Sequence, residues 1–268
     1  RRRAALPWSF GLLLLAGCDF LAIRGGTGAS VANVSKVYFS SNMFLNHAAT
    51  NPVFSFLTTL GDHTDYASEY PFFDEETRAA KFDALRGNGP ASGPSERVLT
   101  KTRPNVVVVI LESFARTVMD ADVDGRPVMP NMRRLRDEGV WFENFFANSF
   151  RTDRGLTSIF SGFPAQPTTS VMKSVERAEN LPSIARELRK AGYATRYYYG
   201  GDANFTNMMA YLVAGGYDRV VSDRDFPISE RRGKWGAHDH IGAERMHAEL
   251  PTGSDAPRLT VFQTSSSH

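Results

Sequence analysis

The chain has 268 residues, a formal net charge of +2 at neutral pH and a single cysteine. This length is enough for one substantial α/β domain with an additional segment. The near-neutral charge, without a long basic stripe, argues against a nucleic-acid partner. The lone Cys18 excludes an intramolecular disulfide and a cysteine-based metal site. Because the chain starts with Arg rather than Met and stops just after a predicted strand, we expect it to be part of a longer protein, truncated at its C-terminus.

The N-terminal stretch has the length and composition of a membrane helix. Residues 4–23 are mostly apolar and follow three arginines, and about 20 apolar residues are needed to cross a bilayer as a helix. The positive-inside tendency places the arginines in the cytoplasm and the rest of the chain outside. Asp19 would lie near the outer interface or face another helix. Residues 1–24 are therefore predicted to be a transmembrane helix of the plasma membrane.

Two alternatives remain for this stretch. The sequence "LLAGC", which ends at Cys18, is similar to a bacterial lipoprotein signal in which that cysteine is lipidated. A buried helix of a soluble domain is the other alternative. Apolar sequence continues past Cys18 as far as Ile23, which favours the membrane helix. The membrane helix and the lipoprotein signal both place the following residues on the outer side.

Residues 25–103 are predicted to connect the membrane helix to the main domain. Apolar residues recur at helical spacings in the first part, with Asn and Ser between them, which is typical of helices at a membrane interface. The end of this region, residues 86–103, is rich in Gly, Pro and Ser. We interpret it as a linker.

From residue 104 onward, strand and helix patterns alternate. The run of β-branched residues at 106–111 is typical of a strand buried on both faces. The alternation predicts a three-layer αβα sandwich with a mostly parallel sheet, in which ligands bind beyond the carboxyl ends of the strands. The predicted strands are 106–111, 140–142, 193–200, 218–221 and 259–263, and the predicted helices are 130–139, 153–160, 181–192, 203–214 and 238–250.

Two residues could support phosphate chemistry at that edge. Glu112 follows the first strand, and its carboxylate is a hard oxygen ligand suited to a divalent metal; the alternative is a residue that only ends the strand. Thr152 begins a predicted helix, where backbone N–H groups favour anions and where a metal could make its hydroxyl nucleophilic. The alternative for Thr152 is a helix N-cap. The neighbouring Arg151 and Arg154 fit anion binding or solvated charges equally.

Polar residues also follow two later strands. The stretch "YYYGGDANF" includes Tyr199 and Asp202 and fits a substrate-contacting loop, or an ordinary turn capped by Asp202. His268 follows the last strand and would lie on the same edge, unless it belongs only to a truncated loop.

A third polar stretch, "KWGAHDH", resembles a metal motif only superficially. Its residues His238, Asp239 and His240 are consecutive, and consecutive residues of one helical turn do not face each other. We therefore expect His238 or Asp239 to cap the following helix.

Taken together, five ordered motifs resemble one family. In order, "PNVVVVILESF", "SFRTDRGLTSIFSGFPAQP", "YYYGGDANF", "WGAHDH" and "TVFQTSSSH" are similar to sequences of the lipoteichoic acid synthase-like phosphoglycerol transferases, of the sulfatase and alkaline phosphatase superfamily. The resemblance covers residues 104–268, which would be the N-terminal part of a sulfatase-like catalytic domain. The stretch "IRGGTG" and the residues after it also resemble the region behind the last membrane helix of such proteins. The resemblance implies that residues 1–24 are the last transmembrane helix of a multi-pass protein.

The resemblance implies roles for several residues. Glu112 would be a metal ligand, and Thr152 would be both ligand and nucleophile, forming a phospho-threonine intermediate. His268 would contact the substrate phosphate or the leaving group. The metal would be Mn²⁺ or Mg²⁺, with Zn²⁺ as an alternative. The other candidate substrate-binding residues are Arg151, Tyr199 and Asp202.

The implied activity is that of a membrane-anchored transferase. It would use head groups of a phosphatidylglycerol-like phospholipid to build or modify a surface polymer or glycan, on the extracytoplasmic side. Two alternatives are an ester hydrolase of the same superfamily and a non-catalytic surface binding domain. Sulfatase chemistry is disfavoured because no Cys or Ser stands in a C/S-x-P-x-R motif.

The chain departs from the family pattern in two respects. The family completes its metal site with an Asp-His pair in a later "GDH"-type motif, and this chain ends before one, so the isolated chain is predicted to be inactive. The synthases also carry a Trp and an Arg for glycerol phosphate where this chain has Thr206 and Met208. These substitutions leave the identity of the head group open.

Overall fold

The computed structural model describes residues 2–28, 30–60, 65–86, 99–250 and 256–268. The chain forms two compact units, one made of Arg1–Ala49 and Asn105–His268 and the other of Thr50–Pro104. The second unit contains the helices α3 (Pro52–Thr59), α4 (Tyr66–Glu69) and α5 (Glu75–Arg86). Most of the linker predicted at residues 86–103 lies outside the described residues.

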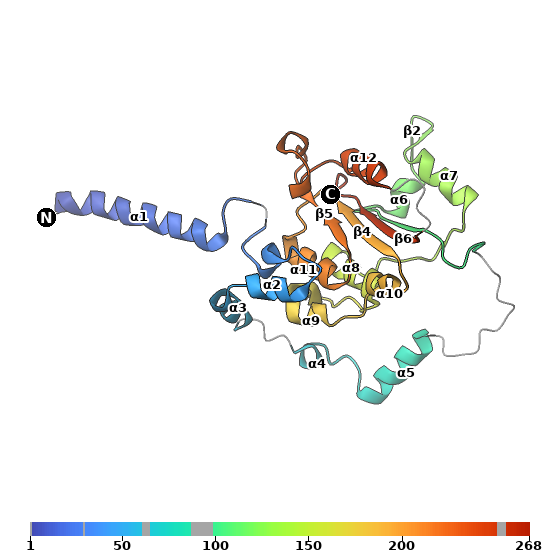
Figure 1. Cartoon of the computed structure of the whole chain (residues 1–268), viewed down its shortest axis with the longest axis horizontal. Helices are drawn as coiled ribbons and strands as arrows, with labels where there is room; N and C mark the ends of the chain where they lie inside the picture. Colours follow the sequence, from blue (N-terminus) through green and yellow to red (C-terminus); the bar gives the residue numbers. More distant parts are fainter. Residues whose placement is uncertain (1, 29, 61–64, 87–98, 251–255) are drawn as a thin grey trace. The chain divides into compact units, whose positions relative to one another are not determined.

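The first unit begins with the long helix α1 (Arg2–Arg24) (Figure 1). Its segment Pro7–Arg24 has a mean hydropathy of 1.3, and none of it is buried. Cys18 and Asp19 are exposed on the same helix. In the part of the chain that the structure describes, α1 is the one helix long and apolar enough to cross a membrane, by length and composition.

The rest of the first unit is built on a four-stranded parallel sheet with the strand order β1-β6-β4-β5. Helices cover both faces: Figure 1 shows α9, α10 and α11 on one side of the strands and α12 on the other. The predicted α/β sandwich is confirmed. The strands are β1 (Val106–Ile110), β4 (Ala194–Tyr199), β5 (Arg219–Val221) and β6 (Arg258–Gln263). The main helices are α8 (Thr152–Ser161), α9 (Val175–Glu179), α10 (Ile184–Lys190), α11 (Met208–Ala214) and α12 (Asp239–Glu249).

Smaller elements complete this unit. Helix α7 confirms the helix predicted to end at Gly139. A short antiparallel pair of strands, which the sequence patterns did not predict, precedes it. These elements are α2 (Met43–Ala49), α6 (Arg116–Met119), β2 (Asp122–Val123), β3 (Arg126–Pro127) and α7 (Pro130–Glu138).

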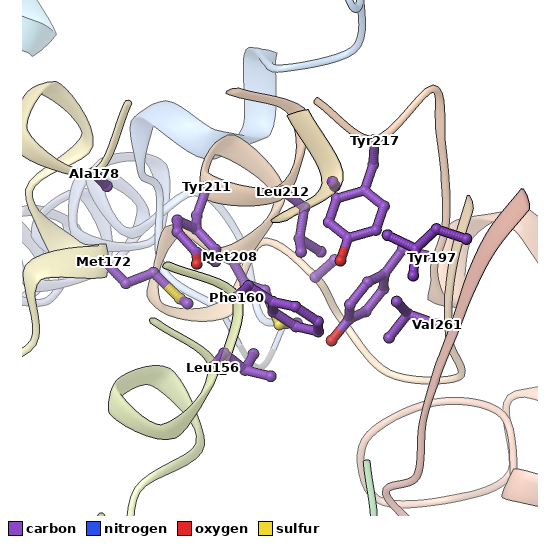
Figure 2. Packing of buried hydrophobic residues seen from close by; sticks show 13 residues of the cluster. Leu156, Phe160, Met172, Ala178, Tyr197, Met208, Tyr211, Leu212, Tyr217 and Val261 are labelled. Carbon is purple, nitrogen blue, oxygen red and sulfur yellow. The ribbon is translucent and has the colours of Figure 1, made fainter. Parts of the chain in front are cut away.

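Alternating side chains of the central strands form a core on each face of the sheet. Tyr197 of β4 lies in the larger core, and its neighbour Tyr198 lies in the core beneath α12, as the two-residue period of a strand requires. In the larger core, the rings of Phe160, Tyr197 and Tyr217 meet edge to face, with centroids 5.3–6.0 Å apart (Figure 2). This packing fixes α8 against the sheet, because Phe160 belongs to that helix.

Three predictions from the sequence patterns were wrong. The first strand is not buried on both faces, since Val107 is 56% exposed and Val109 is 51% exposed. β1 lies at the edge of the sheet, and the apolar residues of α12 pack against a cluster from β4, β5 and β6 instead. Residues 140–142 form no strand. The predicted helix 203–214 is broken by left-handed residues at Thr206 and Asn207, so that α11 begins only at Met208.

Replacing Leu212 by alanine should destabilise the protein strongly. The Leu212 side chain is fully buried in the larger core, and truncating such a leucine costs about 2–5 kcal/mol of unfolding free energy. The matched control is Leu135→Ala on α7, where the leucine is 56% exposed, and its effect should stay within about 0.5 kcal/mol. Denaturant titration of both variants in detergent measures the difference, and equal losses would contradict this description of the core.

Candidate active site

The candidate residues gather where three strands end in one row. Ile110 of β1 and Tyr199 of β4 are both in register with Gln263 of β6, so the carboxyl ends of these parallel strands coincide. Glu112 and His268 follow the ends of β1 and β6 within a few residues. The register therefore brings together side chains that lie far apart in the sequence, as expected for this fold class.

The backbone of Glu112 is held in place from both sides. Its amide donates to the Thr264 hydroxyl at 2.8 Å, and its carbonyl accepts from the Ser267 hydroxyl. Thr264 in turn donates its amide to the carbonyl of Ile110 at 3.0 Å. The next residue, Ser113, has a left-handed backbone with φ of 58°, which turns the chain sharply after the strand. The direction of the Glu112 side chain is thus fixed by the loop after β6.

Thr152 points its hydroxyl at this carboxylate. The Oγ1 atom donates a hydrogen bond to Glu112 Oε2 at 2.8 Å. Thr152 is the first residue of α8, and the N-cap position belongs to Arg151, whose side chain makes no capping bond. The hydroxyl is therefore engaged with Glu112 rather than used as a cap. It lies at the helix N-terminus, where the free N–H groups and the helix dipole favour an anion.

The two arginines beside Thr152 have different environments. Arg151 is partly exposed and pairs through Nε with Asp153 Oδ1 at 3.3 Å. Asp153 is only 5% exposed, and its Oδ2 has no hydrogen-bond partner among the described residues. Arg154 is buried and donates to the carbonyls of Pro167 and Thr168. Arg154 thus stabilises the segment around Pro167, whereas the Arg151 side chain is 42% exposed beside Thr152.

His268 lies on the other side of the same carboxylate. Its Nδ1 is 3.6 Å from Glu112 Oε1, while Thr152 bonds to the second oxygen. The Glu112 carboxylate therefore lies between the hydroxyl and the imidazole, and the structure brings together three of the predicted site residues. The imidazole also packs against the indole of Trp235, with ring centroids 5.0 Å apart and planes at 47°.

Asp239 anchors the loop that carries His268. Its carboxylate accepts the backbone amides of Ser265, at 2.7 Å, and Ser266, at 3.0 Å, and its own amide donates to the Ser266 hydroxyl. His238 occupies the N-cap position of α12, as one of the two expected residues, but its side chain makes no capping bond. The sequence did show an acidic residue at the start of a helix, after a glycine turn. It did not show that the carboxylate of this residue binds backbone amides 26 and 27 residues away.

Tyr199 is the last residue of β4, and Asp202 follows it close to the same edge. Burial raises the pKa of Tyr199 well above its usual value, and the nearby carboxylates of Glu112 and Asp202 raise this pKa further. The phenol is therefore protonated at neutral pH and can donate a hydrogen bond. Asp202 Oδ1 accepts from the backbone amide of Asn204 at 2.9 Å and from its side chain, which stabilises the turn. Burial and the charge of Asp202 also raise the pKa of Asp223.

Glycines allow two loops of the site to touch. Gly201 and Gly236 form an isolated antiparallel bridge, and the Ala237 amide donates to the Gly200 carbonyl at 2.8 Å. A Cβ atom at Gly236 would overlap the Gly200 carbonyl oxygen, and its φ of 146° is unfavourable for other residues. The glycines of "YYYGG" and "KWGA" thus bring the loop of Trp235 against the loop of Asp202.

Substituting Gly236 by alanine should destabilise the protein by about 2 kcal/mol or more, because backbone strain adds to the overlap. The control is Gly155→Ala inside α8, where an added Cβ would have no neighbour within 4 Å. This control should be neutral or stabilising by about 0.5–1 kcal/mol, as alanine favours helix. Thermal unfolding should therefore show a lower Tm for Gly236→Ala and an unchanged or higher Tm for Gly155→Ala, and similar shifts would disprove the close approach of the loops.

The Glu112 carboxylate and the Thr152 hydroxyl fit a divalent cation in their chemistry, because both are hard oxygen donors in contact with each other. Among the residues that the structure describes, no group of three or more His, Cys, Asp or Glu side chains is placed to hold a metal. Two ligands are fewer than such a cation requires. If Glu112 and Thr152 hold a divalent cation, further groups must complete its coordination.

Comparison with known proteins supports a family assignment. Residues 104–268 match the Sulfatase family. Lipoteichoic acid synthase 2 of Bacillus subtilis (strain 168) is 28% identical over 139 residues, which cover 48% of this chain and 20% of that protein. Phosphoglycerol transferase I of Xanthomonas euvesicatoria pv. vesicatoria (strain 85-10) is 30% identical over 150 residues, 52% of this chain and 21% of that protein. The matches thus span about a fifth of the length of these curated relatives.

Solved structures support the same assignment. The lipoteichoic acid synthase LtaP from Listeria monocytogenes has a TM-score of 0.59 at 20% identity, over 71% of this chain and 47% of that chain, and so indicates the shared fold. A protein of the alkaline phosphatase superfamily from Vibrio parahaemolyticus has a TM-score of 0.53 at 30% identity, over 62% and 41% of the two chains. Because the family match covers more than half of the chain, the chain belongs to the Sulfatase family, within the alkaline phosphatase superfamily.

Proposed function

We propose that the protein is a membrane-anchored, metal-dependent phosphoglycerol transferase with Thr152 as its nucleophile. The observation that carries this proposal is the contact of the Thr152 hydroxyl with the Glu112 carboxylate at a helix N-terminus, on the ligand-binding edge of the sheet. Similarity to a lipoteichoic acid synthase and to phosphoglycerol transferases supports the reaction class.

Glu112 and Thr152 would hold the cation, which we propose to be Mn²⁺ or Mg²⁺, with Zn²⁺ as an alternative. When bound, such a cation lowers the pKa of the hydroxyl and neutralises phosphate charge. The N-terminus of α8 adds positive potential for the same anion. Before the reaction, the Glu112 carboxylate accepts the hydroxyl proton of Thr152 in a hydrogen bond, so the oxygen already points toward the ligand-binding edge.

The reaction has two displacements at phosphorus. Thr152 Oγ1 forms a bond to the phosphorus of the lipid head group, the bond to the diacylglycerol oxygen breaks, and that oxygen takes up a proton. The product is a glycerophospho-threonine. An acceptor hydroxyl then forms a bond to the same phosphorus, and the Thr152 oxygen leaves and regains its proton. No oxidant or reductant is needed.

The other residues would bind the substrate. Arg151 is partly exposed beside Thr152 and can pair with phosphate oxygens. His268 lies across Glu112 and would contact the phosphate or the leaving oxygen. The protonated phenol of Tyr199 can donate to the substrate, and Asp202 holds the adjacent loop.

A phospholipid donor lies in the membrane, which gives a reason for a membrane-anchoring helix. We propose that α1 is a transmembrane helix of a multi-pass plasma-membrane protein, and that the catalytic domain lies on the extracytoplasmic side. The donor would be a phosphatidylglycerol-like phospholipid, and the acceptor a surface polymer or glycan. The exposed apolar surface of Pro7–Arg24 supports the membrane location.

Release of diacylglycerol from a fluorescent phosphatidylglycerol tests the proposal. The full-length protein is incubated with the lipid, Mn²⁺ and a glycan acceptor, and a chelator serves as control. The proposal predicts metal-dependent release together with transfer of glycerophosphate to the acceptor. Release with only free glycerol phosphate would instead indicate a hydrolase. Metal binding without release would point to another donor, and failure to bind metal would indicate a non-catalytic surface domain.

A further inference from the structure

We propose that Trp235 is a positioning residue, which holds the imidazole of His268 beside the Glu112 carboxylate. The two rings lie 5.0 Å apart between centroids, at an angle of 47°. A Glu112 oxygen also lies near the imidazole, 3.6 Å from Nδ1, which is longer than a normal hydrogen bond. The His268 side chain is 48% exposed. Packing against the indole is therefore suited to restrain the imidazole sideways.

The indole is itself held by packing and not by hydrogen bonds. Phe205 packs at 5.6 Å between centroids, and the Lys234 ammonium lies 5.3 Å from the centre of the ring system. The indole Nε1 atom is buried and has no hydrogen-bond partner within the described part of the chain. A buried N–H without a partner is unfavourable, so hydrogen bonding does not explain the position of the indole. The indole packs against Phe205 and Lys234, and it therefore offers a fixed surface against which the His268 imidazole packs.

The backbone around Trp235 fixes the position of this support. The bridge between Gly201 and Gly236 ties its loop to the loop after β4. Phe205 comes from that same loop region, where Thr206 and Asn207 have left-handed backbones. Trp235 therefore connects the segment that carries Asp202 to the side chain of His268, although these segments lie far apart in the sequence.

This inference rests on the proposed function, because it assigns to His268 a position that matters for turnover. In the full-length enzyme, Trp235→Ala should lower kcat for the fluorescent phosphatidylglycerol about 10–100-fold, since small misplacements of a reacting group have effects of that size. KM should change little, because a residue that acts only through His268 adds no contact of its own to the lipid. Trp235→Phe keeps an aromatic wall and should retain most of the activity. In a His268→Ala background, Trp235→Ala should cause no further loss.

A second measurement does not depend on turnover. Diethyl pyrocarbonate modifies accessible histidines, and peptide mass spectrometry follows its rate at His268. Trp235→Ala should raise this rate several-fold, while Trp235→Phe should leave it near that of the wild type. Trp141→Ala is the matched control, because Trp141 is 41% exposed and lies outside the site. It should change neither kcat nor the rate of modification.

The outcomes separate this inference from the proposed function. If the wild-type enzyme releases no diacylglycerol, the proposed function fails, and the modification rates still test the contact. An unchanged rate at His268 in Trp235→Ala would overturn the inference. Equal kcat losses from Trp235→Ala with and without His268 would also overturn it, because Trp235 would then act independently of that residue.

Discussion

Replacing Thr152 by alanine is expected to lower kcat for lipid turnover by about 10³-fold or more, as loss of a covalent nucleophile does in other enzymes. Thr152→Ser should retain part of the activity, since it keeps an oxygen at the same position. The physical reason is that, in the proposed mechanism, the hydroxyl bonded to Glu112 is the atom that attacks phosphorus. Diacylglycerol release by the purified full-length variants measures both effects.

A control on the same helix distinguishes chemistry from folding. Thr157 is buried in α8 and donates its hydroxyl to the carbonyl of Arg154, so Thr157→Ala should reduce stability and leave kcat within a few-fold of wild type. If Thr152 served only as a helix cap, its alanine variant would lose about 1 kcal/mol of stability and little activity. That outcome would remove the nucleophile from the proposal.

Substitution of Glu112 by glutamine is expected to weaken Mn²⁺ binding by at least about 100-fold and to reduce turnover in parallel. Even residues one layer behind metal ligands contribute about 10–100-fold to affinity, and in the proposed site glutamine would remove the charge of a direct ligand. The side chain keeps its size, and the two hydrogen bonds of the Glu112 backbone do not depend on it. Isothermal titration of the full-length protein with Mn²⁺ measures the affinity.

The surface glutamate Glu138 on α7 supplies the control, because its side chain is 66% exposed and its Oε1 lies 3.9 Å from Arg134 Nε. Glu138→Gln should bind Mn²⁺ as the wild type does. Unchanged Mn²⁺ affinity in Glu112→Gln would show that the cation binds elsewhere. The contact between Glu112 and Thr152 would then need another explanation.

Several features of the site could be predicted from the sequence, because they depend on local patterns. A β-branched run followed by an acidic residue predicted β1 and placed Glu112 at its carboxyl end. The polar cluster around Thr152 predicted the start of α8 to within one residue. The alternation of strands and helices predicted a parallel sheet, and the rule for ligand sites in such sheets predicted that Glu112 and His268 would share an edge.

Other features depend on contacts between distant segments and could not be predicted. The exposure of Val109 follows from the edge position of β1, and a run of valines does not contain that information. The support of Glu112 by Thr264 joins residues 152 positions apart. The break at Thr206 and Asn207 comes from left-handed backbones in residues that a helical pattern tolerates.

The contact of Trp235 with His268 was also missed, because it joins distant segments of the chain. The motif "KWGAHDH" drew attention to its histidines, whereas the structure gives the central contact to Trp235. The sequence did contain a tryptophan followed by a glycine. That pattern does not reveal that the glycine lies against Gly200 of a different loop and so places the tryptophan in the site.

The most direct test of the central claim is mass spectrometry of the Thr152 peptide. The full-length enzyme is mixed with phosphatidylglycerol and Mn²⁺ without acceptor, quenched in acid and digested. The account predicts a glycerophosphate adduct on Thr152 that requires the lipid and the metal and disappears when acceptor is added. Steady release of diacylglycerol with Thr152 unmodified at every time point would contradict it, because another group would then be attacking phosphorus.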